Sequence, residues 1–226
     1  MSSDTFLCDC PRAVSGLLNQ LGQTLVCLST QLSVVWGFGE SKPGLTSSQP
    51  ISILFTDVVG FSTLMTTWPL EVVASSLTDY FERLSRCVYR YEGQVDKFIG
   101  DGMMAIFQSP DEAVSAAYAI QREVACFNSQ QMGEARCTFP TRIVVDTGLV
   151  VRAALGLGRD RDWTVIGPVV NAASHLAKVL PPGKVFISDS TLWRLTNRRS
   201  LHARDPQTID GFGDEVVVYE VVQWGT

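Results

Sequence analysis

The chain has 226 residues, of which 46% are hydrophobic and 18% charged, so it carries enough apolar material for a packed core and little sign of disorder. Its net charge of −5 argues against a nucleic-acid-binding surface, which needs a basic excess, but leaves room for a small anion held by a few local charges. The six cysteines lack paired CxxC spacing and no secretory leader accompanies them, so we expect reduced thiols and a cytoplasmic protein.

The N-terminal segment is uncharged from residue 13 to residue 39, but several polar side chains interrupt it, so we expect no membrane span. Apolar residues recur there at alternating steps of four and three, from Val14 to Val35, which is typical of a coiled-coil seam. A single amphipathic helix packed on the domain is the alternative. A linker rich in Gly, Pro and Ser follows. We therefore expect a helix and linker over 1–49 and a compact α/β domain over 50–226.

Strands and helices alternate along this domain. The chain order predicts strands at 51–55, 94–98, 103–107, 185–188 and 216–222, helices at 70–91, 110–127 and 169–179, and a long β-rich stretch at 142–155 that breaks at Gly148.

Two carboxylates stand at strand ends. Asp57 follows the first strand, and Asp101 lies at the tip of the next hairpin, so both converge if these elements are neighbours. Paired oxygen ligands suit magnesium, and two such ions can clamp the attacking and leaving oxygens of a displacement at phosphorus. The turn after Asp57 should lead into a helix whose free amides can hold a phosphate chain. Taken singly, each aspartate fits an ordinary N-cap or turn role.

Three sequence blocks favour a catalytic role for these aspartates over an ordinary structural one. They are ILFTDVVGFS (Ile53–Ser62), DKFIGDGMMAIF (Asp96–Phe107) and WTVIGPVVNAAS (Trp163–Ser174). In this order and at these distances they strongly resemble the class III adenylyl and guanylyl cyclases, among them the bacterial-type and light-regulated adenylyl cyclases. The likeness covers about residues 51–222, and three long ordered blocks are far more specific than a single motif.

The resemblance implies a fold and an assembly. The family fold is α/β (α+β): a mixed, mainly antiparallel sheet on a ferredoxin-like core, flanked by helices. Two such domains pair head to tail and form active sites between them, as a homodimer or a heterodimer. One partner supplies the metal ligands for two Mg²⁺ or Mn²⁺ ions, here Asp57, Asp101 and the carbonyl of Val58. The phosphate chain of ATP then lies near Gly60, Phe61 and Ser62.

The other partner reads the base. In this family a Lys at position 97 reads adenine and a Glu reads guanine, and Thr164 fills the partnering position as in bacterial-type adenylyl cyclases. A lysine donor matches the acceptor N1 of adenine and clashes with the N1–H of guanine. Asn171 matches the family residue that orients the ribose. The implied reaction is attack of the ribose 3′ hydroxyl on the α-phosphate, which yields cyclic AMP and pyrophosphate for intracellular signalling.

Two residues depart from the family pattern at positions that contact the phosphate groups of the nucleotide. The family has an Arg where this chain has His175, and a Lys where it has Asp210; Arg159 and Arg161 are candidate compensators. Asp146 stands where the family often has His, which we regard as minor. The sequence thus leaves open an adenylyl cyclase of low activity, one active beside an intact partner, or a degenerate cyclase-homology module that regulates without catalysis.

Overall fold

The structure, a computed structural model, describes residues 48–133, 136–155, 162–198, 201–203, 207–211 and 214–224. The predicted N-terminal helix and Arg159 and Arg161 lie outside these residues. Within them, no helix combines the length and the apolar character needed to cross a membrane.

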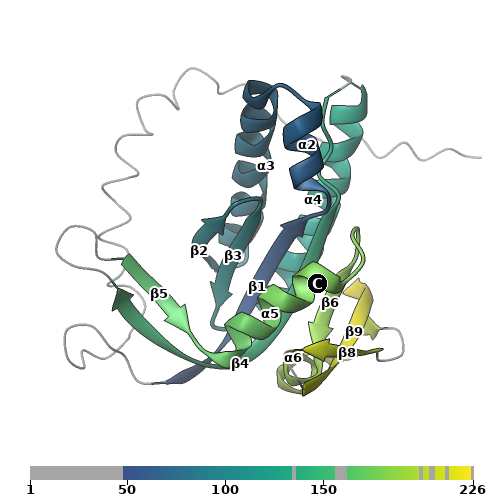
Figure 1. The fold of residues 1–226 in the computed structure, drawn as a ribbon. Coiled ribbons are helices and arrows are strands. Elements are labelled where there is room, and N and C mark those ends of the chain that lie inside the picture. Colours follow the sequence, from purple (N-terminus) through teal and green to yellow (C-terminus); the bar gives the residue numbers. More distant parts are fainter. Residues whose placement is uncertain are drawn as a thin grey trace, which may run out of the picture. The chain divides into compact units, whose positions relative to one another are not determined.

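The first half of the domain is a split β-α-β unit (Figure 1). It consists of β1 (Gln49–Val58), α2 (Phe61–Thr67), α3 (Leu70–Arg90), β2 (Gln94–Ile99), β3 (Gly102–Phe107), α4 (Pro110–Gly133) and β4 (Thr141–Leu155). These strands lie in the order β2-β3-β1-β4, and each pairs antiparallel with its neighbour. That order and the helices between the strands are those of a ferredoxin-like core, as predicted.

The second half extends the sheet. It comprises β5 (Asp162–Ile166), α5 (Pro168–Val179), β6 (Val185–Ser188), α6 (Asp189–Arg194), β7 (Leu201–Ala203), β8 (Gln207–Gly211) and β9 (Asp214–Trp224). Strand β6 joins β4 in parallel, β9 joins β6 in antiparallel, and β7 and β8 both pair with β9. The sheet is therefore mixed and mainly antiparallel, which confirms the predicted class.

Helices cover both faces of the sheet, and each face has its own apolar core. One core joins α3 and α4 to alternate residues of β1, such as Leu54 and Val58. The other joins α5 to the intervening residues, such as Ile53 and Phe55. A strand buried on both faces reads as a continuous apolar run, which is why Ile51–Phe55 was recognisable from the sequence. By the same alternation, Asp57 lies on the α5 face.

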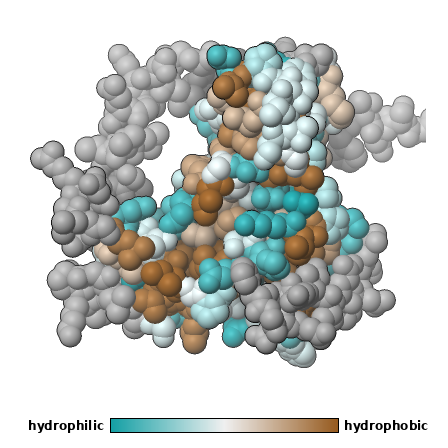
Figure 2. Space-filling view, in the orientation of Figure 1, coloured by the Kyte–Doolittle hydropathy of each residue, from teal (hydrophilic) through white to brown (hydrophobic). Residues whose placement is uncertain are grey.

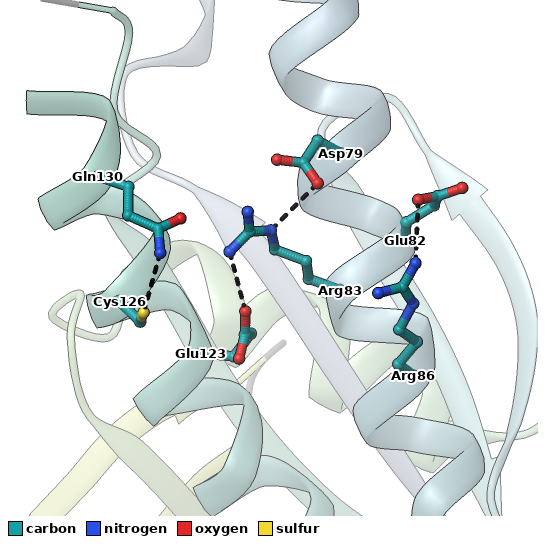
Figure 3. A network of polar contacts seen from close by, with 7 residues as sticks. All are labelled: Asp79, Glu82, Arg83, Arg86, Glu123, Cys126 and Gln130. Atoms are coloured by element: carbon teal, nitrogen blue, oxygen red, sulfur yellow. Dashed lines mark hydrogen bonds and ion pairs between the residues drawn. The ribbon is translucent and has the colours of Figure 1, made fainter. Parts of the chain in front are cut away.

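A polar bridge ties α3 to α4 (Figure 3). Arg83 on α3 donates to Asp79 one turn earlier at 3.1 Å and to Glu123 on α4 at 3.2 Å. Its guanidinium also lies over the ring of Phe127 at 5.4 Å. The two helices that back the site are thus joined at their surface as well as through the core.

One predicted break is absent. Strand β4 runs through Gly148 without interruption, where we expected the β-rich stretch to break. A Cβ at this position would come within 3.0 Å of the Val169 Cβ on α5. The glycine therefore marks the close approach of a helix to the sheet, and not a turn.

Candidate active site

Asp57 and Asp101 meet at one end of the sheet. Asp57 is the penultimate residue of β1, and Asp101 lies in the turn between β2 and β3. The Oδ2 atom of Asp101 accepts a hydrogen bond from the backbone N–H of Val58 at 3.2 Å. Gly102 sits so close to β1 that a Cβ there would lie 2.7 Å from the Thr56 carbonyl oxygen. The tight packing of hairpin on strand brings the two carboxylates together.

Two cations that the sequence reasoning missed lie beside Asp57. Arg142 faces Asp57 directly in the antiparallel register of β1 and β4, and its Nη1 donates to Oδ2 of Asp57 at 2.9 Å. Its Nε donates to the Leu180 carbonyl, just beyond α5, at 2.6 Å. Lys178, in the last turn of α5, also acts electrostatically on Asp57. Only the strand register, which no local pattern reveals, would have identified Arg142.

At this end of the sheet the carboxylates of Asp57 and Asp101 are opposed by the positive charges of Arg142 and Lys178. Burial raises the pKa of Asp57, the Arg142 hydrogen bond opposes this, and the nearby Asp101 charge raises it further. No group of three or more His, Cys, Asp and Glu side chains that is arranged to hold a metal ion occurs in the described part of the chain. Two carboxylates and the Val58 carbonyl are nonetheless a hard-oxygen donor set that fits magnesium, which keeps its other positions for water and phosphate.

The start of α2 offers backbone donors next to these carboxylates. Gly60, the N-cap, has a left-handed φ of 74°, and no side chain caps this helix end. Gly60 and Ser62 are exposed and Phe61 is half-buried. The first N–H groups of a helix lack intrahelical partners, so this turn can present them to a phosphate group. The residues predicted to contact the phosphate chain therefore follow Asp57 directly, between the end of β1 and the start of α2.

Lys97 and Thr164, 67 positions apart in the chain, are in contact. The Lys97 Nζ donates to Thr164 Oγ1 at 2.5 Å. Lys97 belongs to β2 and Thr164 to β5, which hydrogen-bonds to β4 and lies off the main path of the sheet. The structure thus joins the two positions that the sequence resemblance assigned to base recognition.

Asn171 and His175 lie one turn apart on α5, so they share a face of that helix. Asn171 is exposed and His175 is half-buried. Asp210 lies in β8, which pairs with β9, but its side chain is outside the described part of the structure. The proximity of Arg142 and Lys178 to Asp57 supplies positive charge from other elements.

Asp57, Arg142 and Lys97 belong to the sheet face that carries α5. Lys97 pairs with Met104, a member of the core under α5, and Asp57 and Arg142 follow the alternation of Phe55 and Val144 on that side. Next to them, Figure 2 shows apolar side chains gathered at the β4–β5 end of the domain. Among the described residues of this hairpin, the exposed large apolar ones are Leu149, Leu155, Trp163 and Ile166.

Comparison with known proteins agrees with this geometry. The sequence profile of the adenylate and guanylate cyclase catalytic domain matches residues 45–223. An adenylate cyclase of Anabaena cylindrica is 28% identical over 197 residues, which are 82% of this chain and 39% of that protein. The chain spans only about a fifth to two fifths of the length of such curated relatives.

Solved structures give the same answer for the fold. The guanylyl cyclase Cya2 superposes with a TM-score of 0.74 and 26% identity, over 79% of this chain and 94% of that one. The adenylyl cyclase CyaB from P. aeruginosa superposes with a TM-score of 0.73 and 25% identity, over 78% and 95%. With its ferredoxin-like sheet, converging aspartates and matching profile, the chain belongs to the family of adenylate and guanylate cyclase catalytic domains.

Proposed function

We propose that this domain is an adenylyl cyclase, which converts ATP to 3′,5′-cyclic AMP and pyrophosphate at a site shared between two chains. The observation that carries the proposal is the contact between Lys97 and Thr164 on the same sheet face as Asp57. A lysine ammonium is a donor without acceptor capacity, so it suits adenine N1 and opposes the N1–H of guanine.

The reaction needs mainly positioning and charge stabilisation. Asp57, Asp101 and the Val58 carbonyl would hold Mg²⁺ or Mn²⁺, which when bound would clamp the attacking and leaving oxygens at phosphorus. The Arg142 guanidinium, which bonds Asp57, and the amides at the start of α2 would supply donors for the departing pyrophosphate. Asn171 would orient the ribose so that its 3′ hydroxyl is in line with the α-phosphate.

Dimerisation would complete the site. An exposed apolar hairpin is unusual on a lone domain, and the β4–β5 hairpin bears Leu149, Leu155, Trp163 and Ile166 at 43% to 60% exposure. It adjoins the α5 face that holds the site residues. Pairing of two such faces would bring Lys97, Thr164 and Asn171 of one chain to Asp57 and Asp101 of the other.

A second function has its own support in two substitutions. His175 and Asp210 stand where the family has an Arg and a Lys, and an arginine finger in other phosphoryl-transfer enzymes is worth ~10³–10⁵ in rate. The alternative is therefore a domain with an intact metal side that serves one site of a heterodimer, or that binds nucleotide and regulates. Arg142 and Lys178 favour activity, because they place positive charge at Asp57.

The decisive experiment measures cyclic AMP formation by the purified chain with ATP and Mg²⁺ or Mn²⁺. The test variant is Asp57→Ala, and Glu82→Ala, an exposed α3 carboxylate with a side chain 64% exposed, is the matched control. We expect metal-dependent product from the parent and the control, and a loss of at least ~10²-fold in the test variant, as for removal of a group that stabilises transition-state charge.

Equal activity in the parent and Asp57→Ala would exclude this site as the catalytic centre. A folded dimer that binds ATP without forming product would instead support the regulatory or heterodimeric alternative.

A further inference from the structure

Strand β2 contains a bulge at Asp96. Val95 pairs with Ala105 and Lys97 pairs with Met104, so Asp96 is an extra residue with no partner of its own on β3. In a regular strand, successive side chains point to opposite faces, and Asp96 and Lys97 would be separated by the sheet. A bulge resets this alternation. Here it places a carboxylate and an ammonium from adjacent residues on the same face.

The two side chains form a close ion pair. Oδ2 of Asp96 lies 2.9 Å from Lys97 Nζ, and the Asp96 side chain is only 8% exposed. This oxygen is sealed from solvent and makes no hydrogen bond of good geometry within the described structure. Burial raises the pKa of Asp96, and Lys97 is the largest opposing influence. A buried carboxylate that is held mainly by one ammonium is costly unless that ammonium stays in place.

The contacts of Lys97 determine how many of its N–H donors remain for a ligand. An ammonium has three N–H donors. One is taken by Thr164 Oγ1 at 2.5 Å, and a second direction faces Asp96. The third is left for one acceptor. With both neighbours in place, the flexible lysine stem is restrained, and part of its ordering cost is met before a base arrives.

We propose that Asp96 is a positioning residue for base selection: through the bulge it holds the Lys97 ammonium so that one N–H is directed at the N1 acceptor of a 6-aminopurine. This inference rests on the proposed function, and it adds a residue that never touches the nucleotide. Thr164 fixes the ammonium from β5 and Asp96 fixes it from β2. Base choice is therefore a property of the triad and not of Lys97 alone.

The test measures the preference for ATP over GTP in four variants of the full chain. Asp96→Asn and Asp96→Ser remove the charge, Asp96→Glu retains it, and Asp162→Asn is the matched control. Asp162 is an exposed carboxylate on β5 whose charge reaches Asp96, and its removal leaves the Asp96–Lys97 pair intact. For each variant, ATP and GTP affinities are measured by calorimetry with Ca²⁺, and kcat/KM for each nucleotide with Mn²⁺. Melting temperatures identify any variant that fails to fold.

We expect the two neutral variants to lose on the order of tenfold in ATP over GTP preference, which is the loss for one hydrogen bond to a charged group. The loss should appear in KM and in the ATP dissociation constant, with kcat little changed. Asp96→Glu should retain most of the preference and Asp162→Asn all of it. In a Lys97→Met background, Asp96→Asn should have no further effect, since the two act as a unit.

An unchanged ATP/GTP affinity ratio in both neutral variants, in a chain where Lys97→Met does alter it, would overturn the inference. So would equal effects of Asp96→Asn with and without Lys97. Failure of the proposed function is a separate result: it appears as absent cyclic AMP in the parent, while the affinity ratios still decide the role of Asp96.

Discussion

At the level of single residues, Asp146 is the most deeply embedded charge on β4. Its Oδ1 accepts three hydrogen bonds, from the Thr147 N–H at 2.8 Å, Ser188 Oγ at 2.5 Å and Ser190 Oγ at 2.9 Å. The residue is 7% exposed. Burial raises the pKa of Asp146, and the three hydrogen bonds only partly oppose that rise. Asp146, whose difference from the family residue we regarded as minor, thus joins β4 to the β6–α6 junction.

This raised pKa predicts a stability that falls with rising pH. Between the unfolded value of 3.8 and the raised native value, the folded chain keeps a proton on Asp146 that the unfolded chain has lost. Stability therefore declines as pH rises through that window, by about 1.4 kcal/mol for each tenfold difference in proton affinity. We expect Asp146→Asn to flatten this part of the profile in urea denaturation between about pH 4 and pH 7.

Asp57, Asp96 and Glu112, whose pKa values are raised chiefly by burial, add slopes of the same sign in the parent and the variant. The difference between the two profiles therefore isolates Asp146. Glu82→Gln on the exposed side of α3 controls for the loss of one charge. Parallel profiles for the parent and Asp146→Asn would contradict the assignment.

At the level of elements, the fit of the β2–β3 hairpin on β1 decides the site. Gly100 has a left-handed φ of 61°, which lets the chain reverse, and Gly102 lies against the Thr56 carbonyl. The Met103 N–H also donates to Thr56 Oγ1 at 3.1 Å. Asp101 lies between these two glycines, so its carboxylate is placed by backbone geometry.

Gly102→Ala should destabilise the domain by about 1–3 kcal/mol, the usual range for overpacking. The added Cβ would lie 2.7 Å from a backbone oxygen that cannot move without shifting β1. Gly133→Ala is the control, because a Cβ at Gly133, at the end of α4, meets nothing within 4 Å. Urea midpoints measure both. Activity should fall more in Gly102→Ala than stability explains, since Asp101 moves; equal stability of the two variants would refute the packing argument.

At the level of the whole molecule, the proposed site residues form two separate groups. Asp57, near the end of β1, meets Asp101 from the β2–β3 turn, whereas Lys97, Thr164 and Asn171 lie on β2, β5 and α5. If two faces pair about a twofold axis, each complete site uses the metal ligands of one chain and the base and ribose residues of the other.

Mixing two inactive variants tests this arrangement. Asp57→Ala and Asn171→Ala should each be nearly inactive as homodimers. When they are co-expressed, half of the dimers are mixed, and each mixed dimer has one intact site of two, so cyclic AMP formation should recover to about a quarter of the parent rate. A double variant that carries both substitutions in one chain, expressed alone, should show no such recovery. No recovery from a verified mixed dimer would show that the sites are not shared.

Much of this protein was predictable from the sequence. The strand predicted before Asp57, the hairpin around Asp101 and the helix predicted at 70–91 were recognisable from apolar periodicity and glycine position. Both signals depend on residues close together in the chain. The order of the three motif blocks indicated the ferredoxin-like fold, and the structure confirms it.

The tertiary structure decided the neighbours of the site. Arg142 meets Asp57 through a register between β1 and β4, and a bulge sets Asp96 beside Lys97. Gly148 accommodates α5 instead of breaking β4. Local patterns in the sequence specify which way a chain segment folds, whereas the pairing of distant strands follows from the packing of both sheet faces at once. Charges that face each other across strands therefore became visible only in the folded domain.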